Sequence, residues 1–173
     1  MHKINFFKYF AYGSNMSIRR LLERCSTANF LGIAKIENYK LAFNKKSSLD
    51  KSGKANIIET DNPSDIVWGV IFEIEESQKT QLDEAEGNGY GYDDHTIKVI
   101  DSKGQEHECI VYIATEAKYI DNSLTPMDWY LEHCLIGARE NGLPEDYILI
   151  IKSQSSIKDK NIERAQRERN IYN

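Results

Sequence analysis

The ten residues FKYFAYGSNM, at positions 7–16, constrain the fold more than any other stretch of this 173-residue chain. The first half is apolar and aromatic, which is typical of a buried β-strand. The second half carries Gly13, Ser14 and Asn15. These residues favour a tight turn because Gly and Asn tolerate a positive φ, and Ser and Asn can cap a helix. We therefore predict a strand that passes through a sharp turn.

An amphipathic segment follows this turn, with Ile18, Leu21 and Leu22 on one side, and it predicts a short helix that ends near Cys25. A strand that turns into a helix points several backbone N–H groups at one spot, and that spot attracts anions. We expect Gly13 to adopt a conformation that only Gly takes cheaply. An ordinary strand–turn–helix connection is the alternative that the pattern alone leaves open.

Composition excludes several classes of function. The net charge is −5 and the pI about 5.4, so nucleic acid is not an expected partner, because phosphate binding requires a basic face. No apolar run is long enough to cross a membrane. Cys25, Cys109 and Cys134 are odd in number and widely spaced, which argues against a metal site or a disulfide framework and favours the cytoplasm. A homodimer is left open.

Periodicity predicts one domain over residues 1–152 and a charged C-terminal tail over 153–173, helical or frayed. Thr125 and Pro126 are the expected N-cap and first residue of the longest helix, and Ser77 the expected cap of an earlier one. The other expected elements are strands at 30–36, 39–43, 66–73, 96–101 and 107–114, a helix at 76–86 with Leu82 and Ala85 inward, an exposed loop at 44–54 and a flexible loop at 87–92.

Glu86 is the strongest candidate for chemistry. It closes a run of carboxylates with Asp83 and Glu84, and Gly87 is a suitable helix stop directly after it. A carboxylate at a helix C-terminus faces the negative end of the helix dipole, which raises its pKa. The alternative is a solvated acidic helix end.

Several segments resemble the γ-glutamylcyclotransferase family, and the matches at the start, middle and end of the chain occur in the family's order. Tyr9–Asn15 resembles its signature loop, and Leu82–Gly87 resembles the motif in which the glutamate before glycine is the catalytic acid/base. Pro126–Tyr130 and Gly137–Pro144 resemble its C-terminal block. Ser52–Ile57 is similar to a segment of bacterial members, so we expect a bacterial-type member with this segment near the mouth of the site.

This resemblance implies an α+β fold, a mixed β-barrel or sheet flanked by helices. It implies cyclisation of a γ-glutamyl compound to 5-oxoproline with release of an amine or amino acid, without metal or cofactor. Glu86 would be the general acid/base, Glu84 would point to solvent, and Tyr130 would reach the small-molecule substrate through its hydroxyl. The remaining residues implied to bind substrate are Tyr9, Phe10, Ala11, Tyr12, Gly13, Ser14 and Asn15.

Two alternatives to this reading remain. A γ-glutamylamine cyclotransferase acting on glutamyl-lysine compounds would favour an acidic rim, for which Asp93 and Asp94 are candidates. A γ-glutamyl amino acid carries a second carboxylate and would favour a basic rim, for which the candidates are Lys45, Lys46, Lys51 and Lys54. A binding module of the same fold without turnover is the alternative of a different class.

Overall fold

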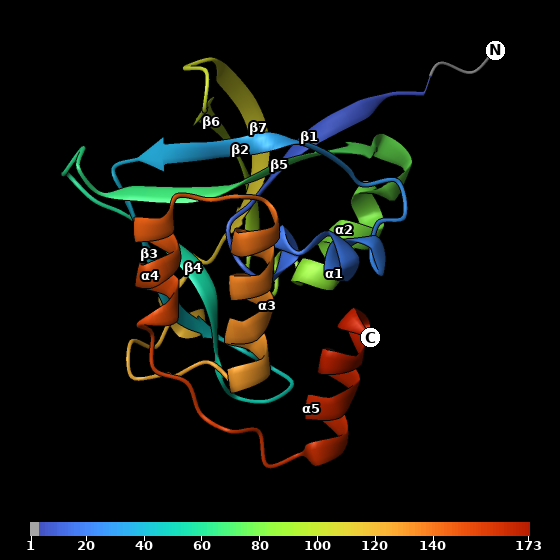
Figure 1. The fold of residues 1–173 in the computed structure, drawn as a ribbon, viewed down its shortest axis with the longest axis vertical. Coiled ribbons are helices and arrows are strands. Elements are labelled where there is room, and N and C mark those ends of the chain that lie inside the picture. Colours follow the sequence, from blue (N-terminus) through green and yellow to red (C-terminus); the bar gives the residue numbers. More distant parts are fainter. Residues whose placement is uncertain (1–3) are drawn as a thin grey trace.

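The computed structural model describes residues 4–173, and its strands within this range form a closed five-stranded barrel and a separate two-stranded sheet (Figure 1). The barrel order is β1-β5-β2-β6-β7, and β3 pairs with β4 in the second sheet. The strand bounds are β1 Phe6–Ala11, β2 Asn29–Glu37, β3 Tyr39–Lys46, β4 Gly53–Glu59, β5 Ile66–Glu75, β6 Asp93–Asp101 and β7 Glu106–Ile113.

β1 is the strand that closes the barrel. It runs antiparallel to β5, with Tyr9 opposite Phe72, and parallel to β7, where Tyr9 also pairs with Ile110. A Cβ at Gly69 would lie 2.4 Å from the carbonyl oxygen of Ala11, so only glycine allows β5 to approach β1 this closely. The expected α+β fold with a mixed barrel and flanking helices is confirmed.

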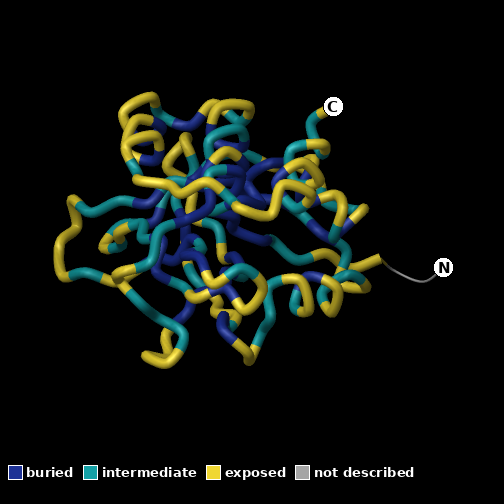
Figure 2. Tube along the Cα trace, turned by 90° about the horizontal axis from the view of Figure 1, so that it is seen from below, coloured by how far each residue is buried: buried dark blue, intermediate teal, exposed yellow. Residues whose placement is uncertain are grey.

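The helices lie outside this barrel: α3 and α4 stand side by side below β2 and β5 in Figure 1, and α5 lies farther from the strands, next to α3. Buried residues, dark blue in Figure 2, gather in the middle of the molecule between these layers. The core includes Phe10, Phe72 and Leu82, each fully buried. The helix bounds are α1 Ile18–Leu22, α2 Lys79–Glu86, α3 Asp128–Glu140, α4 Glu145–Lys152 and α5 Ile162–Arg169.

The expected start of α3 at Thr125 and Pro126 is wrong. The helix begins at Asp128, with Met127 as its N-cap, because the preceding segment is extended and bonded to distant backbone. The Thr125 carbonyl accepts from the Gly53 N–H, and the Pro126 carbonyl accepts from the Ile157 N–H. Long-range pairing therefore overrides the local capping signal.

Two smaller expectations for α2 also fail. Ser77 does not cap the helix, since it lies in a 3₁₀ turn at Glu76–Gln78 and its hydroxyl donates to Glu75. Ala85 is exposed, whereas Leu82 is buried as expected. The stop is confirmed, because Gly87 ends the helix with a φ of 66°.

The segment 44–54 is only in part the exposed loop that its lysines suggest: residues 47–52 form a loop in which Ser48, Leu49 and Lys51 are exposed. Its ends belong to β3 and β4, and Asn44, Ser47 and Ser52 are buried. Their polar side chains are satisfied inside the protein: Asn44 donates to Asn122, and Ser52 donates to Asp50. Hydrogen bonds thus allow these three polar side chains to be buried.

Candidate active site

A small cavity of about 30 Å³ lies where the end of β1, the end of α2 and one face of α3 meet. Phe10 and Ala11 do not line it, because both are buried in the barrel wall, and this departs from the expected set. Its lining residues are Tyr9, Tyr12, Gly13, Ser14, Asn15, Ala55, Glu86, Tyr92, Tyr112 and Tyr130. The remaining sequence candidates are therefore brought together in one place.

Gly13 is required for space and not for a positive φ. Its φ of −116° lies outside the left-handed region, so the reason for glycine that the structure gives is close contact. A Cβ here would lie 2.8 Å from the Cβ of Ala55 and 3.4 Å from the Tyr130 hydroxyl. The missing side chain lets the loop pass against β4 and α3.

The turn after Gly13 is a 3₁₀-helix at Ser14–Met16, and it leaves donors without partners. The backbone N–H groups of Gly13, Ser14 and Asn15 make no hydrogen bond to any part of residues 4–173. A helix start always leaves such N–H groups, and they carry partial positive charge. The loop therefore offers an anion three backbone donors beside the cavity.

Asn15 links the loop to Glu86. Its amide nitrogen donates to Glu86 Oε1 at 2.5 Å and to the Tyr9 hydroxyl at 3.1 Å. Its amide oxygen accepts from the Arg24 guanidinium. With both ends of the amide bonded, the side chain has one orientation, and it holds the Glu86 carboxylate at the cavity.

Glu86 is the last residue of α2 and its carboxylate sits among apolar and tyrosine side chains. Burial raises the pKa of this carboxyl above its usual value of 4.5, although Arg24, Arg20 and Lys45 act to lower it. Burial is thus the main cause, in place of the helix dipole that the sequence suggested. Glu84, by contrast, is exposed, as expected.

Comparisons with known proteins agree with this geometry. The AIG2-like family matches residues 66–150. Human gamma-glutamylcyclotransferase is 36% identical over 146 residues, which cover 82% of this chain and 74% of that protein, and the mouse protein is 37% identical over the same shares. The chain belongs to the γ-glutamylcyclotransferase family. A solved gamma-glutamyl cyclotransferase has a TM-score of 0.85 at 30% identity, covering 96% of this chain and 99% of that one.

These relatives in the γ-glutamylcyclotransferase family are enzymes by name, and the curated ones are mammalian. The expected bacterial-type assignment is therefore not supported. Ala55 lines the cavity, so the segment at 52–57 does lie beside the site where we expected it.

In this member of the γ-glutamylcyclotransferase family, a ring of tyrosines surrounds the carboxylate, and sequence reasoning missed two of them. Tyr92 follows the glycine-rich loop, and its hydroxyl donates to the Ala55 carbonyl. Tyr112 lies in β7, and its hydroxyl donates to Asp83 at 2.6 Å while its carbonyl accepts from Tyr12 at 2.6 Å. Alternation in β7 marks Tyr112 as facing one side, but no sequence signal tells which side holds the cavity.

The Tyr9 hydroxyl accepts from Asn15 and donates to no group in residues 4–173. Tyr130 is a second ring member with an unused proton. Its hydroxyl oxygen accepts from the Ala55 N–H at 3.1 Å, and the hydroxyl donates to nothing else in residues 4–173. Burial raises the pKa of Tyr130, so the phenol stays protonated. Its proton is available to a ligand oxygen in the cavity.

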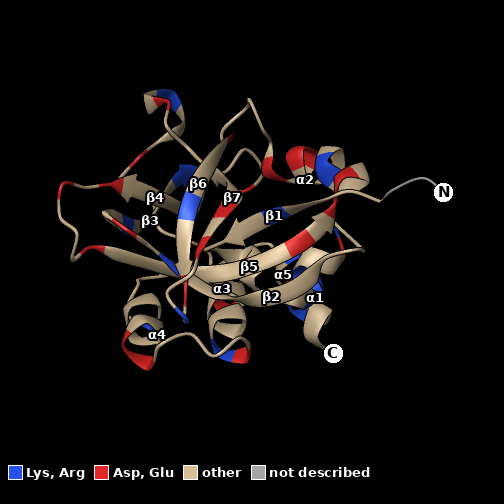
Figure 3. Ribbon diagram, turned by 90° about the horizontal axis from the view of Figure 1, so that it is seen from above, with Lys and Arg blue, Asp and Glu red and all other residues tan. Residues whose placement is uncertain are grey.

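A larger groove of about 410 Å³ adjoins the cavity and shares Ser14, Glu86, Tyr92 and Tyr130 with it. Figure 3 shows Lys and Arg on α1 and α5, two of the elements beside it. Basic side chains predominate around the groove: Arg20, Arg24, Lys45, Lys54, Arg164 and Arg167 line it with the acids Asp50, Glu84, Glu86 and Glu168.

Lys45 is the lysine whose charge is left for a ligand. Its ammonium makes no ion pair within residues 4–173 and lies 4.7 Å from the centre of the Tyr92 ring. Lys54 is instead paired with Asp50 at 2.7 Å. Lys46 and Lys51 do not line the groove. Of the four lysines proposed for a basic rim, Lys45 alone both lines the groove and makes no ion pair in the described part of the chain.

Other kinds of site find no support in residues 4–173. No three His, Cys, Asp or Glu side chains gather there in a way that could hold a metal ion. None of the helices in the same range has the length and apolar character needed to span a bilayer.

Proposed function

We propose that this chain cyclises a γ-glutamyl compound to 5-oxoproline, with Glu86 as the general acid/base. The observation that carries the proposal is the position of Glu86: a carboxyl of raised pKa in a cavity that also holds three unbonded backbone N–H groups and the free Tyr130 proton. A carboxyl whose pKa lies nearer neutrality exchanges protons with an amine more readily. Family membership supports the same activity.

The reaction needs one proton shuttle. The substrate's α-amine attacks the γ-carbonyl carbon, a C–N bond forms, and the bond to the leaving nitrogen breaks. Glu86 would take the proton that the α-ammonium loses and give it to the leaving amine. Because nucleophile and electrophile belong to one molecule, holding them in the reactive geometry supplies much of the acceleration.

The donors around the cavity would hold the rest of the glutamyl group. The N–H groups of Gly13, Ser14 and Asn15 suit the α-carboxylate or the oxyanion that develops on the γ-carbonyl. Whichever of the α-carboxylate and the oxyanion these N–H groups bind, the Tyr130 hydroxyl would donate to the other. A cavity of about 30 Å³ has room for only about two water molecules, so a γ-glutamyl compound would extend into the groove.

The groove favours a leaving group that carries a carboxylate. Lys45 offers such a group an unpaired ammonium at the cavity mouth. Asp93 and Asp94, the candidates for an acidic rim, do not line the groove, and Asp94 is paired with Lys79 at 3.1 Å. We therefore propose γ-glutamyl amino acids or peptides ahead of γ-glutamyl amines.

A panel of compounds tests the activity. The panel contains a γ-glutamyl amino acid, γ-glutamyl-lysine linked through the side chain, a γ-glutamyl alkylamine and the matching α-glutamyl dipeptide, with 5-oxoproline measured by chromatography. We expect product from the γ-glutamyl amino acid first and none from the α-glutamyl control. Binding of γ-glutamyl compounds without any 5-oxoproline would favour the non-catalytic binding module.

Lys45→Gln tests the leaving-group assignment, with Lys46→Gln as its control, because Lys46 donates to the Lys118 carbonyl outside the groove. Lys45→Gln should raise KM for the γ-glutamyl amino acid on the order of tenfold, as expected for a lost charged hydrogen bond, and leave the alkylamine unaffected. Equal effects on both substrates would contradict the assignment.

We also infer a cytoplasmic location. Cys25, Cys109 and Cys134 are buried free thiols, each remote from the others in sequence. Such unpaired cysteines suit a reducing compartment. Fractionation of the source cells with a specific antibody tests this inference.

A further inference from the structure

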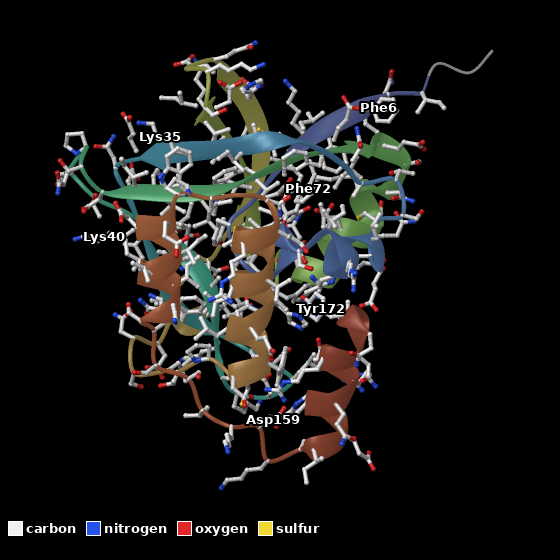
Figure 4. All side chains as sticks on the ribbon, in the orientation of Figure 1. Phe6, Lys35, Lys40, Phe72, Asp159 and Tyr172 are labelled. Carbon is white, nitrogen blue, oxygen red and sulfur yellow. The ribbon has the colours of Figure 1, made fainter. Side chains whose placement is uncertain are left out.

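The end of the chain packs against the elements that form the candidate site. Figure 4 places Tyr172 beside α3 and below α1, and Figure 1 shows α5 leading up to this point. On the way, Glu168 of α5 accepts from the Arg20 guanidinium of α1 at 2.5 Å. The two side chains are only 17% and 10% exposed, so solvent screens this ion pair weakly.

Arg20 carries the contact from α5 to the loop beside the cavity. Its Nε donates to the Ser14 hydroxyl at 3.1 Å, while its Nη1 lies 3.1 Å from His133 Nε2 as well as bonding Glu168. One guanidinium thus joins α5, α3 and the loop. Because its donors have fixed directions, a shift of Glu168 changes the angle at which Arg20 meets Ser14.

His133 and Tyr172 complete the arrangement. Burial lowers the pKa of His133, although the neighbouring Glu168 acts to raise it. Its Nδ1 lies 2.6 Å from the Tyr172 hydroxyl, and its Nε2 lies 3.1 Å from Arg20 Nη1 and 3.2 Å from Glu168 Oε2. Glu168 contacts both Arg20 and His133, and Tyr172 contacts His133, so two residues from beyond position 160 belong to this arrangement.

The ion pair of Glu168 with Arg20 also affects the electrostatic environment of Glu86. Arg20 is one of three cations that lower the pKa of Glu86 against the effect of burial. Burial also acts to raise the pKa of Glu168, but His133 and Arg20 bring it down to about 2, so Glu168 is ionised wherever the protein is folded at working pH. Its negative charge offsets part of the charge of Arg20.

We propose that Glu168 is a positioning residue of the candidate site: through Arg20 it fixes Ser14 in the cavity loop and moderates the positive charge that Glu86 meets. This inference rests on the proposed function for its catalytic meaning. Helix α5 contributes no residue to the small cavity, although its Arg164, Arg167 and Glu168 line the adjoining groove, and the proposal makes Glu168 part of the site.

The main competing account is that α5 only stabilises the fold. Glu168→Gln separates the two accounts, because it keeps the shape and one acceptor oxygen but removes the charge. Glu163→Gln is the matched control, since Glu163 lies exposed on the same helix and makes no polar side-chain contact within residues 4–173. Glu168→Asp keeps the charge and should restore part of any effect.

The first measurement is kinetic. Glu168→Gln should lower kcat/KM for 5-oxoproline formation on the order of tenfold, as for a lost charged hydrogen bond, and move the acid limb of the pH profile to lower pH. Groups that face Glu86 and shape this profile are Arg20, Arg24, Lys45, Tyr9, Tyr12, Tyr92, Tyr112 and Tyr130. Groups that face Arg20 or Glu168 are Lys54, His133, Cys134, Arg164, Arg167 and Tyr172.

The second measurement does not depend on turnover. A ¹³C NMR titration of the Glu86 carboxyl should give a lower pKa in Glu168→Gln than in the wild-type protein, with no change in Glu163→Gln. If Glu168→Gln matches Glu163→Gln in this titration, the proposal is wrong. A wild-type protein that forms no 5-oxoproline would overturn the proposed function, whereas the titration would still decide whether Glu168 acts on Glu86.

Discussion

The Asn15 amide donates to the Glu86 carboxylate at 2.5 Å across 71 positions of sequence. This bond joins the turn after β1 to the end of α2, the two places where the sequence carries its strongest signals. Because Asn15 is itself held by Arg24 and Tyr9, Glu86 has a fixed position before any ligand enters.

Glu86→Gln should lower the rate of 5-oxoproline formation by about 10²–10⁴-fold, because glutamine keeps the shape but cannot carry a proton. Glu84→Gln is the matched control, since Glu84 is exposed on the same helix end. Steady-state assays of both variants check this prediction. A Glu86→Gln enzyme with near wild-type turnover, beside an inactive Glu84→Gln, would reverse the assignment.

The raised pKa of Glu86 predicts two pH effects. First, kcat/KM should rise with pH through a midpoint above 4.5 as Glu86 ionises. Second, a carboxyl whose folded pKa exceeds its unfolded pKa contributes stability that is present below the unfolded pKa and is lost as pH rises through the folded pKa. The Tm of Glu86→Gln minus the Tm of the wild-type protein should therefore increase as the pH rises through the folded pKa of Glu86. A constant Tm difference from pH 4 to 8 would contradict the raised pKa.

Gly13→Ala should weaken ligand binding, because the new methyl group would lie 2.8 Å from the Ala55 Cβ. Overpacking of this kind costs about 1–3 kcal/mol of stability, and here it displaces the loop. Ala55→Gly removes the opposing methyl group, so the double variant should recover part of the affinity for 5-oxoproline measured by calorimetry. Folded Gly13→Ala and Gly13→Val proteins with unchanged affinity would remove the loop from the site.

Tyr130→Phe and Tyr92→Phe form a matched pair. Each leaves one backbone group of Ala55 without its partner, so each should cost about 1–3 kcal/mol of stability. Of these two tyrosines, Tyr130 has a proton free for substrate, whereas the Tyr92 proton is donated to Ala55, so Tyr130→Phe alone of the pair should lower kcat/KM, by about tenfold. Thermal melts and kinetics on both variants check this, and equal kinetic losses would argue that Tyr130 acts by packing.

Activity should survive exhaustive EDTA treatment and gel filtration. The proposed ring closure takes its nucleophile from the substrate and its proton shuttle from Glu86, so it requires no added ion. Loss of turnover on chelation, with recovery on adding a divalent cation, would instead make Asp83, Glu84 and Glu86 candidates for metal ligands.

Local patterns in the sequence predicted many of the secondary-structure elements. The apolar run before Gly13 predicted β1, the Gly87 stop predicted the end of α2, and alternation predicted the hairpin of β6 and β7. These features depend on neighbouring residues, whose propensities and side-chain periodicity are readable along the chain. The same signals failed at Thr125 and Pro126, whose carbonyls accept from the distant backbone N–H groups of Gly53 and Ile157.

The sequence by itself determined which residues could do chemistry, since a glutamate before a helix-stopping glycine and a glycine turn after a strand are local patterns. Only the tertiary structure decided what surrounds them. Barrel closure brings Tyr112 and Tyr92 to the cavity, and the return of the chain end brings Glu168 to Arg20. Periodicity records that a side chain is buried but not which distant residue it meets, because that depends on how all the elements pack at once.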